Sequence, residues 1–143
     1  MKSKKEAEIL MNEILPFAKR MLKEFGGFHP YGGYMKRDGA IVEVGVDTPF
    51  EETPPANNLV EALQNSFREI AKSGECKLTA ILFDVRISIP ATNSKSDAIQ
   101  VSLEHEEGYS ADVFLPYLKT GNDLVWGQMF AQEGQRKIFK RRI

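Results

Sequence analysis

Apolar residues recur at helical spacing in two parts of the chain. In residues 4–25 they lie three or four positions apart, with lysines and glutamates between them, which predicts an amphipathic helix. Pro16 lies inside this segment and predicts a kink near Asn12, because proline removes a helical hydrogen bond and clashes with the carbonyl four residues earlier. A second helix is predicted to end at about Ser73, with Phe67 on its buried face.

Strand patterns fill most of the remaining chain. Gly26-Gly27 ends the first helix, and the aromatic and β-branched residues that follow predict a hairpin around the Asp38-Gly39 turn. Residues 124–131 are one further candidate strand, and three other segments alternate apolar and polar residues as half-buried strands do: 81–89, 99–105 and 109–115. This alternation indicates a sheet with one buried face and one face exposed to solvent, which is typical of antiparallel sheets.

The predicted order is helix, strand, strand, helix and then three or four strands (α-β-β-α-β-β-β-β). We therefore predict an α+β fold with a mostly antiparallel sheet of five to six strands and two helices packed on one face. The length of 143 residues suits a single domain spanning residues 1–143, with residues 132–143 as a basic tail.

Composition and charge narrow the class of partner. The net charge of −1 gives no argument for nucleic acid, so a nucleic-acid partner is not expected. The charges are unevenly distributed, since residues 38–112 are rich in acids while residues 136–142 carry basic residues and no acid. No segment approaches the roughly 18 uninterrupted apolar residues of a spanning helix. We expect a soluble cytoplasmic protein with no membrane partner.

The residues that could support metal or nucleophilic chemistry are few and far apart. His29, Cys76 and His105 show none of the short spacings of metal ligands, so we expect no metal and no cofactor. His105 continues the apolar side of its strand and is expected to be a hydrogen-bonded histidine at the end of the core. No nucleophile elbow or phosphate loop occurs, so no catalytic residue is assigned.

Two surfaces are candidates for interaction with a partner. The hairpin is expected to bring three side chains together near one end of the sheet: His29, Tyr31 and Tyr34. The outward face of the sheet is expected to present charged side chains and the single tryptophan: Asp84, Arg86, Glu104, Asp112 and Trp126. Trp126 could also be a core residue, because tryptophan occurs both in cores and at interfaces.

Several short segments of the sequence resemble those of a known group of proteins. The Phe-His-Pro-Tyr-Gly segment 28–32, the Leu-Phe-Asp-Val-Arg strand 82–86 and the Leu-Glu-His strand 103–105 are similar to those of small bacterial proteins without an assigned function. The resemblance spans roughly residues 10–118. It implies a bacterial single-domain protein, and because its motifs are strands and turns it implies no functional residue.

The patterns leave three functions open. The absence of a dense catalytic motif favours a binding protein that engages a protein partner through the acidic sheet face and the aromatic hairpin. An immunity protein that masks a basic toxin is a special case of this function. A small enzyme would use His29, Tyr31 and Tyr34, or alternatively His105 and Glu104, as acid–base groups.

Self-association is the third function. The strand predicted at 124–131 has apolar residues on both faces, which implies that its outer face is covered. A second copy of the chain is the simplest cover, because a two-fold axis makes one surface complementary to itself. We therefore expect a homodimer formed through Trp126 and Phe130 or their outward neighbours, unless the basic tail covers the same surface.

Overall fold

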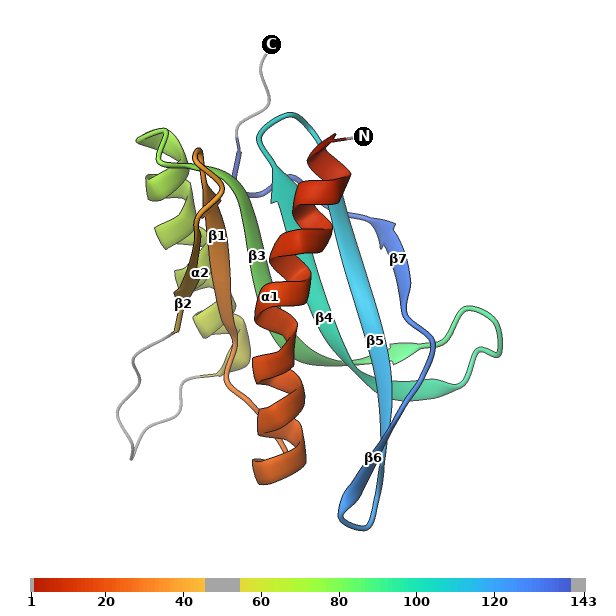
Figure 1. Cartoon of the computed structure of the whole chain (residues 1–143). Coiled ribbons are helices and arrows are strands. Elements are labelled where there is room, and N and C mark those ends of the chain that lie inside the picture. The colour runs from red at the N-terminus through yellow and green to blue at the C-terminus, as the bar shows by residue number, and fades with distance from the viewer. Residues whose placement is uncertain (1, 46–54, 140–143) are drawn as a thin grey trace.

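The computed structural model describes residues 2–45 and 55–139 (Figure 1). Its elements in chain order are α1 (Lys2–Phe25), β1 (Tyr31–Lys36), β2 (Ile41–Val44), α2 (Ala56–Lys72), β3 (Cys76–Ser88), β4 (Lys95–His105), β5 (Ser110–Thr120), β6 (Asp123–Trp126) and β7 (Phe130–Glu133). The strands form one antiparallel sheet in the order β2-β1-β3-β4-β5-β6, and β7 also pairs with β5. The predicted α+β class and the order of helices and strands are confirmed.

The two helices cover opposite faces of the sheet, so the prediction that both pack on one face is wrong (Figure 1). Helix α1 packs on Leu78, Ala80 and Leu82 of β3, whereas α2 packs on the face that presents Ile81 and Phe83. The physical reason lies in β3, whose first half is apolar on both sides. Each apolar side must be removed from water, and each therefore requires its own helix.

Two glycines in β1 allow both helices to approach the sheet. A Cβ at Gly32 would lie 2.3 Å from the carbonyl oxygen of Ala80 and 3.0 Å from the ring of Phe67 in α2. A Cβ at the next residue, Gly33, would lie 3.4 Å from the side chain of Ile14 in α1. Because successive side chains of a strand point to opposite faces, these neighbouring glycines serve opposite helices.

Helix α1 continues through Pro16, and its buried face differs in part from the predicted one. The residues that it buries are Ser3, Ala7, Leu10, Met11, Ile14, Leu15, Ala18 and Leu22. Two aromatic residues that share the apolar spacing of residues 4–25, Phe17 and Phe25, are instead 37% and 72% exposed. The Tyr31 hydroxyl accepts a hydrogen bond from the amide of Ala18 at 3.1 Å and donates one to the carbonyl of Ile14 at 2.6 Å. Tyr31 therefore ties β1 to the backbone of α1.

The predicted last strand, 124–131, is two short strands, β6 and β7. The Trp126 ring packs on Tyr117 on the α1 side, and the Nζ of Lys19 lies 5.3 Å from its centre. Phe130 instead stacks on Phe114, which β5 presents on the α2 side. A single dimer surface containing both Trp126 and Phe130 is therefore wrong, because the two rings lie on opposite faces of the sheet.

The described part of the predicted basic tail is packed against the protein. Ile138 and Phe139 are buried and join the apolar cluster of α2. Residues 140–143 lie outside the described part of the chain. Neither α1 nor α2 has the length and the apolar character that crossing a membrane would require.

Candidate binding groove

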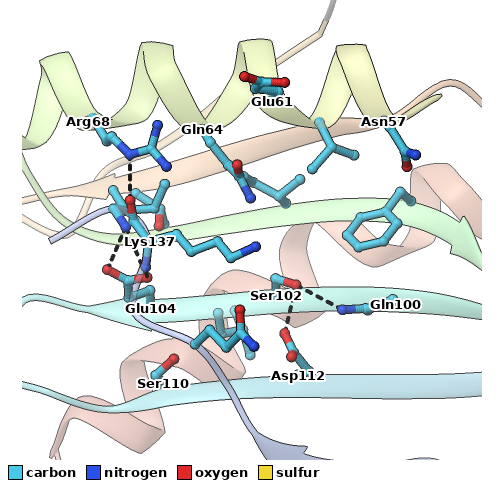
Figure 2. A pocket seen from close by; sticks show the side chains of 17 residues that line it. Asn57, Glu61, Gln64, Arg68, Gln100, Ser102, Glu104, Ser110, Asp112 and Lys137 are labelled. Carbon is cyan, nitrogen blue, oxygen red and sulfur yellow. Dashed lines mark hydrogen bonds between the residues drawn. The ribbon is translucent and has the colours of Figure 1, made fainter. Parts of the chain in front are cut away.

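A groove runs between α2 and the sheet. Helix α2 packs mainly on β3 and β1, and a cavity of about 550 Å³ lies beside it over β4 and β5 (Figure 2). Side chains from α2, from three strands and from residues 135–138 line this cavity. We call the cavity the groove and residues 134–139 the C-terminal segment.

The floor of the groove is a chain of hydrogen bonds across β4 and β5. The amide nitrogen of Gln100 donates to the hydroxyl of Ser102 at 3.2 Å, and that hydroxyl donates to Asp112 at 2.7 Å (Figure 2). The side-chain carbonyl of Gln100 and the second carboxylate oxygen of Asp112 accept no hydrogen bond from the described residues. Ile81 and Phe83 of β3 add apolar surface beside this polar floor.

The helical wall of the groove is polar because the side of α2 that faces the groove carries polar and charged side chains. Asn57, Glu61, Gln64 and Arg68 are spaced by three or four residues, so they share one side of the helix. The first three have no hydrogen-bond partner among the described residues. They therefore offer side-chain amide and carboxylate groups to a ligand.

The C-terminal segment closes one end of the groove through Glu104, a carboxylate that is only 4% exposed. Its oxygens accept the backbone amides of Lys137 at 2.7 Å, Ile138 at 2.9 and 3.1 Å and Phe139 at 2.5 Å. The guanidinium of Arg68 donates to the carbonyl of Lys137 at 2.5 Å. The side chain of Lys137 extends into the groove (Figure 2).

The sheet brings only two of its predicted site residues to the groove, Glu104 and Asp112. Asp84 and Arg86 lie on the α1 face, where Asp84 accepts a hydrogen bond from Tyr117 at 2.8 Å and Arg86 pairs with Asp97 at 3.2 Å. Desolvation raises the pKa of the Asp84 carboxyl, and it also raises the pKa of the Tyr117 phenol. The single acidic sheet face that was predicted is therefore wrong.

The aromatic hairpin does not gather its side chains into one site. Tyr31 is buried against α1, whereas Tyr34 packs edge-on against Phe67 of α2 on the other face, with ring centres 6.1 Å apart. His29 is exposed and precedes the strand. Because Tyr31 and Tyr34 point to opposite faces of β1, the predicted acid–base group of His29, Tyr31 and Tyr34 is not formed.

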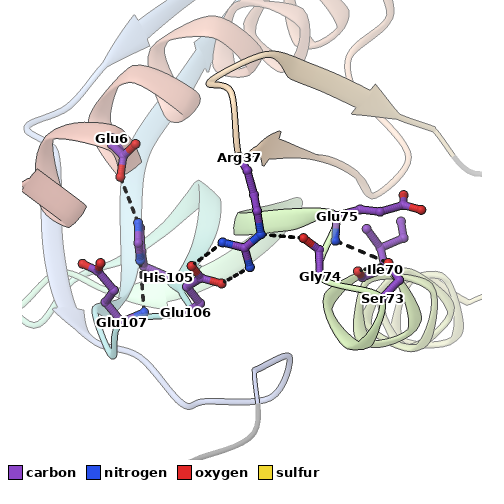
Figure 3. A network of polar contacts seen from close by, with 9 residues as sticks. All are labelled: Glu6, Arg37, Ile70, Ser73, Gly74, Glu75, His105, Glu106 and Glu107. Atoms are coloured by element: carbon purple, nitrogen blue, oxygen red, sulfur yellow. Dashed lines mark hydrogen bonds and ion pairs between the residues drawn. The ribbon is translucent and has the colours of Figure 1, made fainter.

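His105 and Glu104 also point to opposite faces, since they are neighbours in β4. The Glu107 amide donates to Nδ1 of His105 at 3.1 Å, so the ring proton is on Nε2, which contacts Glu6 at 3.0 Å (Figure 3). Glu6 also pairs with Lys77. His105 is thus a buried structural histidine that connects α1 to the sheet, and it forms no acid–base pair with Glu104.

The described residues offer little for metal or thiol chemistry. No group of three or more His, Cys, Asp or Glu side chains converges among them as a metal site would require. Cys76 is buried, and burial raises the pKa of its thiol to about 11. A thiol with a raised pKa is a poor nucleophile, because the thiolate is the reactive form.

Sequence reasoning missed the wall of α2 and the C-terminal segment. Their signals were present, because the polar residues of α2 recur at helical spacing and Ile138-Phe139 is an apolar pair within a basic stretch. Comparisons of this chain with protein-family models, curated proteins and solved structures found no match. The geometry of the groove therefore carries the functional argument.

Proposed function

We propose that this protein is a binding protein that holds a segment of a partner polypeptide in the groove. The observation that carries the proposal is the C-terminal segment, because one end of the groove already holds polypeptide. Glu104 accepts three of its backbone amides, and Arg68 donates to one of its carbonyls. Side chains of the groove therefore recognise main-chain groups.

The open part of the groove has the chemistry to continue this recognition. Gln64, Asn57 and the side-chain carbonyl of Gln100 supply hydrogen-bond donors and acceptors. A bound segment needs both, because its backbone has N–H groups that donate and carbonyl groups that accept. Ile81 and Phe83 supply apolar surface for side chains. A volume of about 550 Å³ lies within the range of ordinary ligand sites.

An enzymatic function is less well supported by the residues of the groove. Among the described residues that line the groove, Ser102 has the only hydroxyl with a carboxylate partner, since it donates directly to Asp112, and none of these residues is a histidine. A serine needs a base that is itself oriented by a third group to become a nucleophile. The narrower predictions of an immunity protein and of a cytoplasmic location stay predictions.

A peptide array tests the proposal. Short peptides of random sequence are immobilised and probed with the labelled full-length protein, and each positive spot is probed again with two variants. Gln64→Trp places a large ring in the groove, whereas Ser66→Trp places the same ring on an exposed part of α2 that does not line it. We expect Gln64→Trp to abolish most signals and Ser66→Trp to keep them.

The proposal is wrong if the array gives no signal above background. It is equally wrong if the signals are the same for both variants, since the bound peptides would then lie outside the groove. Thermal unfolding of each variant verifies that it is folded before the array is interpreted.

Self-association is a second candidate that a specific observation favours. Leu118 and Val125 are cross-strand neighbours in β5 and β6 and are 62% and 54% exposed. We propose that a second copy covers this pair, in place of a surface containing both Trp126 and Phe130. Light scattering at micromolar concentration should report a dimer that Leu118→Lys converts to a monomer, and a wild-type monomer would exclude this candidate.

A further inference from the structure

We propose further that the C-terminal segment is a built-in occupant of the groove, and that the partner replaces it with a segment of the same character. That character is a basic residue followed by two large apolar residues, as in Lys137-Ile138-Phe139. This inference rests on the proposed function. It adds the kind of residues that the partner must present, and it states that the C-terminal segment competes with the partner for the groove.

The charges of the groove favour a basic residue. With the C-terminal segment in place, the carboxylates of Glu61, Asp112 and Glu104 share the groove with Arg68 and Lys137. Removal of the segment would take Lys137 away and would free Glu104 from its three amides. The vacated site would carry three carboxylates against the single guanidinium of Arg68, so it would attract a basic segment.

The apolar contacts require large side chains after the basic residue. Ile138 and Phe139 cover Leu63 and Phe67 of α2 and Ile81 of β3. A replacement with small or polar side chains would leave these residues in contact with water, whereas two large apolar residues would restore their cover.

The backbone contacts make replacement by another polypeptide feasible. Lys137, Ile138 and Phe139 belong to no helix or strand, so the departure of these three residues breaks no ladder of backbone hydrogen bonds. The backbone hydrogen bond from the Gly134 amide to the Ser110 carbonyl, at 3.1 Å, lies at the other end of the segment. Glu104 would be left as a buried carboxylate without its donors, which is unfavourable. A second polypeptide supplies the same amides, while a ligand without backbone amides does not.

A peptide with the sequence of residues 134–139, Gly-Gln-Arg-Lys-Ile-Phe-amide with a fluorophore on its N-terminal nitrogen, is the probe. Fluorescence anisotropy measures its binding to the wild-type chain and to Phe139→Ala. A tethered segment competes at an effective concentration on the order of millimolar, so we expect wild type to bind weakly and Phe139→Ala to bind at least about tenfold more tightly. A peptide of the same composition in scrambled order should bind at least about tenfold more weakly.

Hydrogen exchange of the wild-type chain keeps the proposal testable if Phe139→Ala does not fold. The amides of residues 137–139 should be protected by Glu104, and saturating peptide should speed their exchange because it displaces them. Unchanged exchange with bound peptide overturns the proposal. Equal affinities of wild type and Phe139→Ala, or of the two peptides, also overturn it.

The two proposals can fail separately. If the array finds ligands that Gln64→Trp blocks, but none of them displaces the C-terminal segment, then the groove binds polypeptide and the segment is only structural. If the array finds no ligand, the proposed function fails together with this inference.

Discussion

The backbone amide of Ile138 donates to both carboxylate oxygens of Glu104, at 3.1 and 2.9 Å. This contact joins the C-terminal segment to the middle strand of the groove, and the amides of Lys137 and Phe139 flank it. A buried carboxylate is costly unless donors surround it, so these amides both hold the segment in place and satisfy the oxygens of Glu104.

The first prediction concerns the removal of this carboxylate. Glu104→Ala leaves the three amides without their acceptor, so we expect it to lower the free energy of unfolding by about 3 kcal/mol. Glu104→Gln keeps one acceptor oxygen and should lose less. Glu107→Ala, an exposed control in the turn that follows β4, should lose almost nothing. Urea unfolding measures all three, and an unchanged stability of Glu104→Ala would contradict the role of this contact.

The second prediction concerns the hydroxyl of Tyr31, which bonds two backbone groups of α1. Tyr31→Phe removes the acceptor for the Ala18 amide and the donor to the Ile14 carbonyl. We expect a loss of about 1–2 kcal/mol in the free energy of unfolding. Tyr34→Phe is the matched control, because no hydrogen bond of its hydroxyl is found among the described residues. Equal stabilities of the two variants in urea would refute the account of Tyr31.

The third prediction concerns the close approach of the strands and α2 at Gly32. Gly32→Ala would place a methyl group 2.3 Å from the carbonyl of Ala80 and 3.0 Å from the ring of Phe67, so the backbone must shift. We expect a loss of about 3 kcal/mol in the free energy of unfolding. Gly27→Ala meets nothing within 4 Å and should be neutral or stabilising by up to about 1 kcal/mol. Thermal unfolding in which Gly32→Ala matches wild type would contradict this packing.

The fourth prediction concerns pH. Desolvation acts to raise the pKa of Glu6, but the hydrogen bonds and charges of Lys77 and His105 outweigh it and lower the pKa below the ordinary value of 4.5. The folded state thus favours the charged form, so Glu6 contributes stability above pH 4.5 that is lost as the pH falls through its lowered pKa. Glu6→Gln should be less stable than wild type at neutral pH, and the difference should shrink below pH 4.5.

Glu13→Gln on the exposed side of α1 is the control for this titration. Denaturant unfolding measured from neutral to acidic pH compares the three proteins. A constant difference between Glu6→Gln and wild type over that range would show that the charge of Glu6 does not stabilise the fold.

The class and element order could be predicted because periodicity is a local property of the sequence. The side of the sheet that each helix covers is not local, and there the prediction failed. The alternation that begins at Ile81 identified one apolar side of β3, but Leu78, Ala80 and Leu82 form a second apolar side on the other face. A strand that is apolar on both faces indicates two covering layers, and this signal was available in the sequence.

Part of the candidate site could also be predicted, because the alternation of side chains along a strand is a local property of the sequence. Glu104 and Asp112 alternate with buried residues in β4 and β5, so their side chains had to leave the α1 core. Asp84 was predicted to share a face with Glu104 and Asp112, but it lies on the α1 face. The prediction failed because only one side of β3, the side that begins at Ile81, was taken to be buried. The contact of Glu104 with Ile138 joins distant parts of the chain, and only tertiary packing of the C-terminal segment creates it.

Amide NMR tests the central claim, that the groove binds polypeptide, most directly. The isotope-labelled full-length chain is titrated with the strongest peptide from the array, and shift changes are mapped on the structure. We predict clear changes at Gln64, Gln100, Ser102 and Asp112, with little change near Trp126 on the opposite face. Changes confined to the α1 face, or to the Leu118–Val125 pair, would contradict the claim.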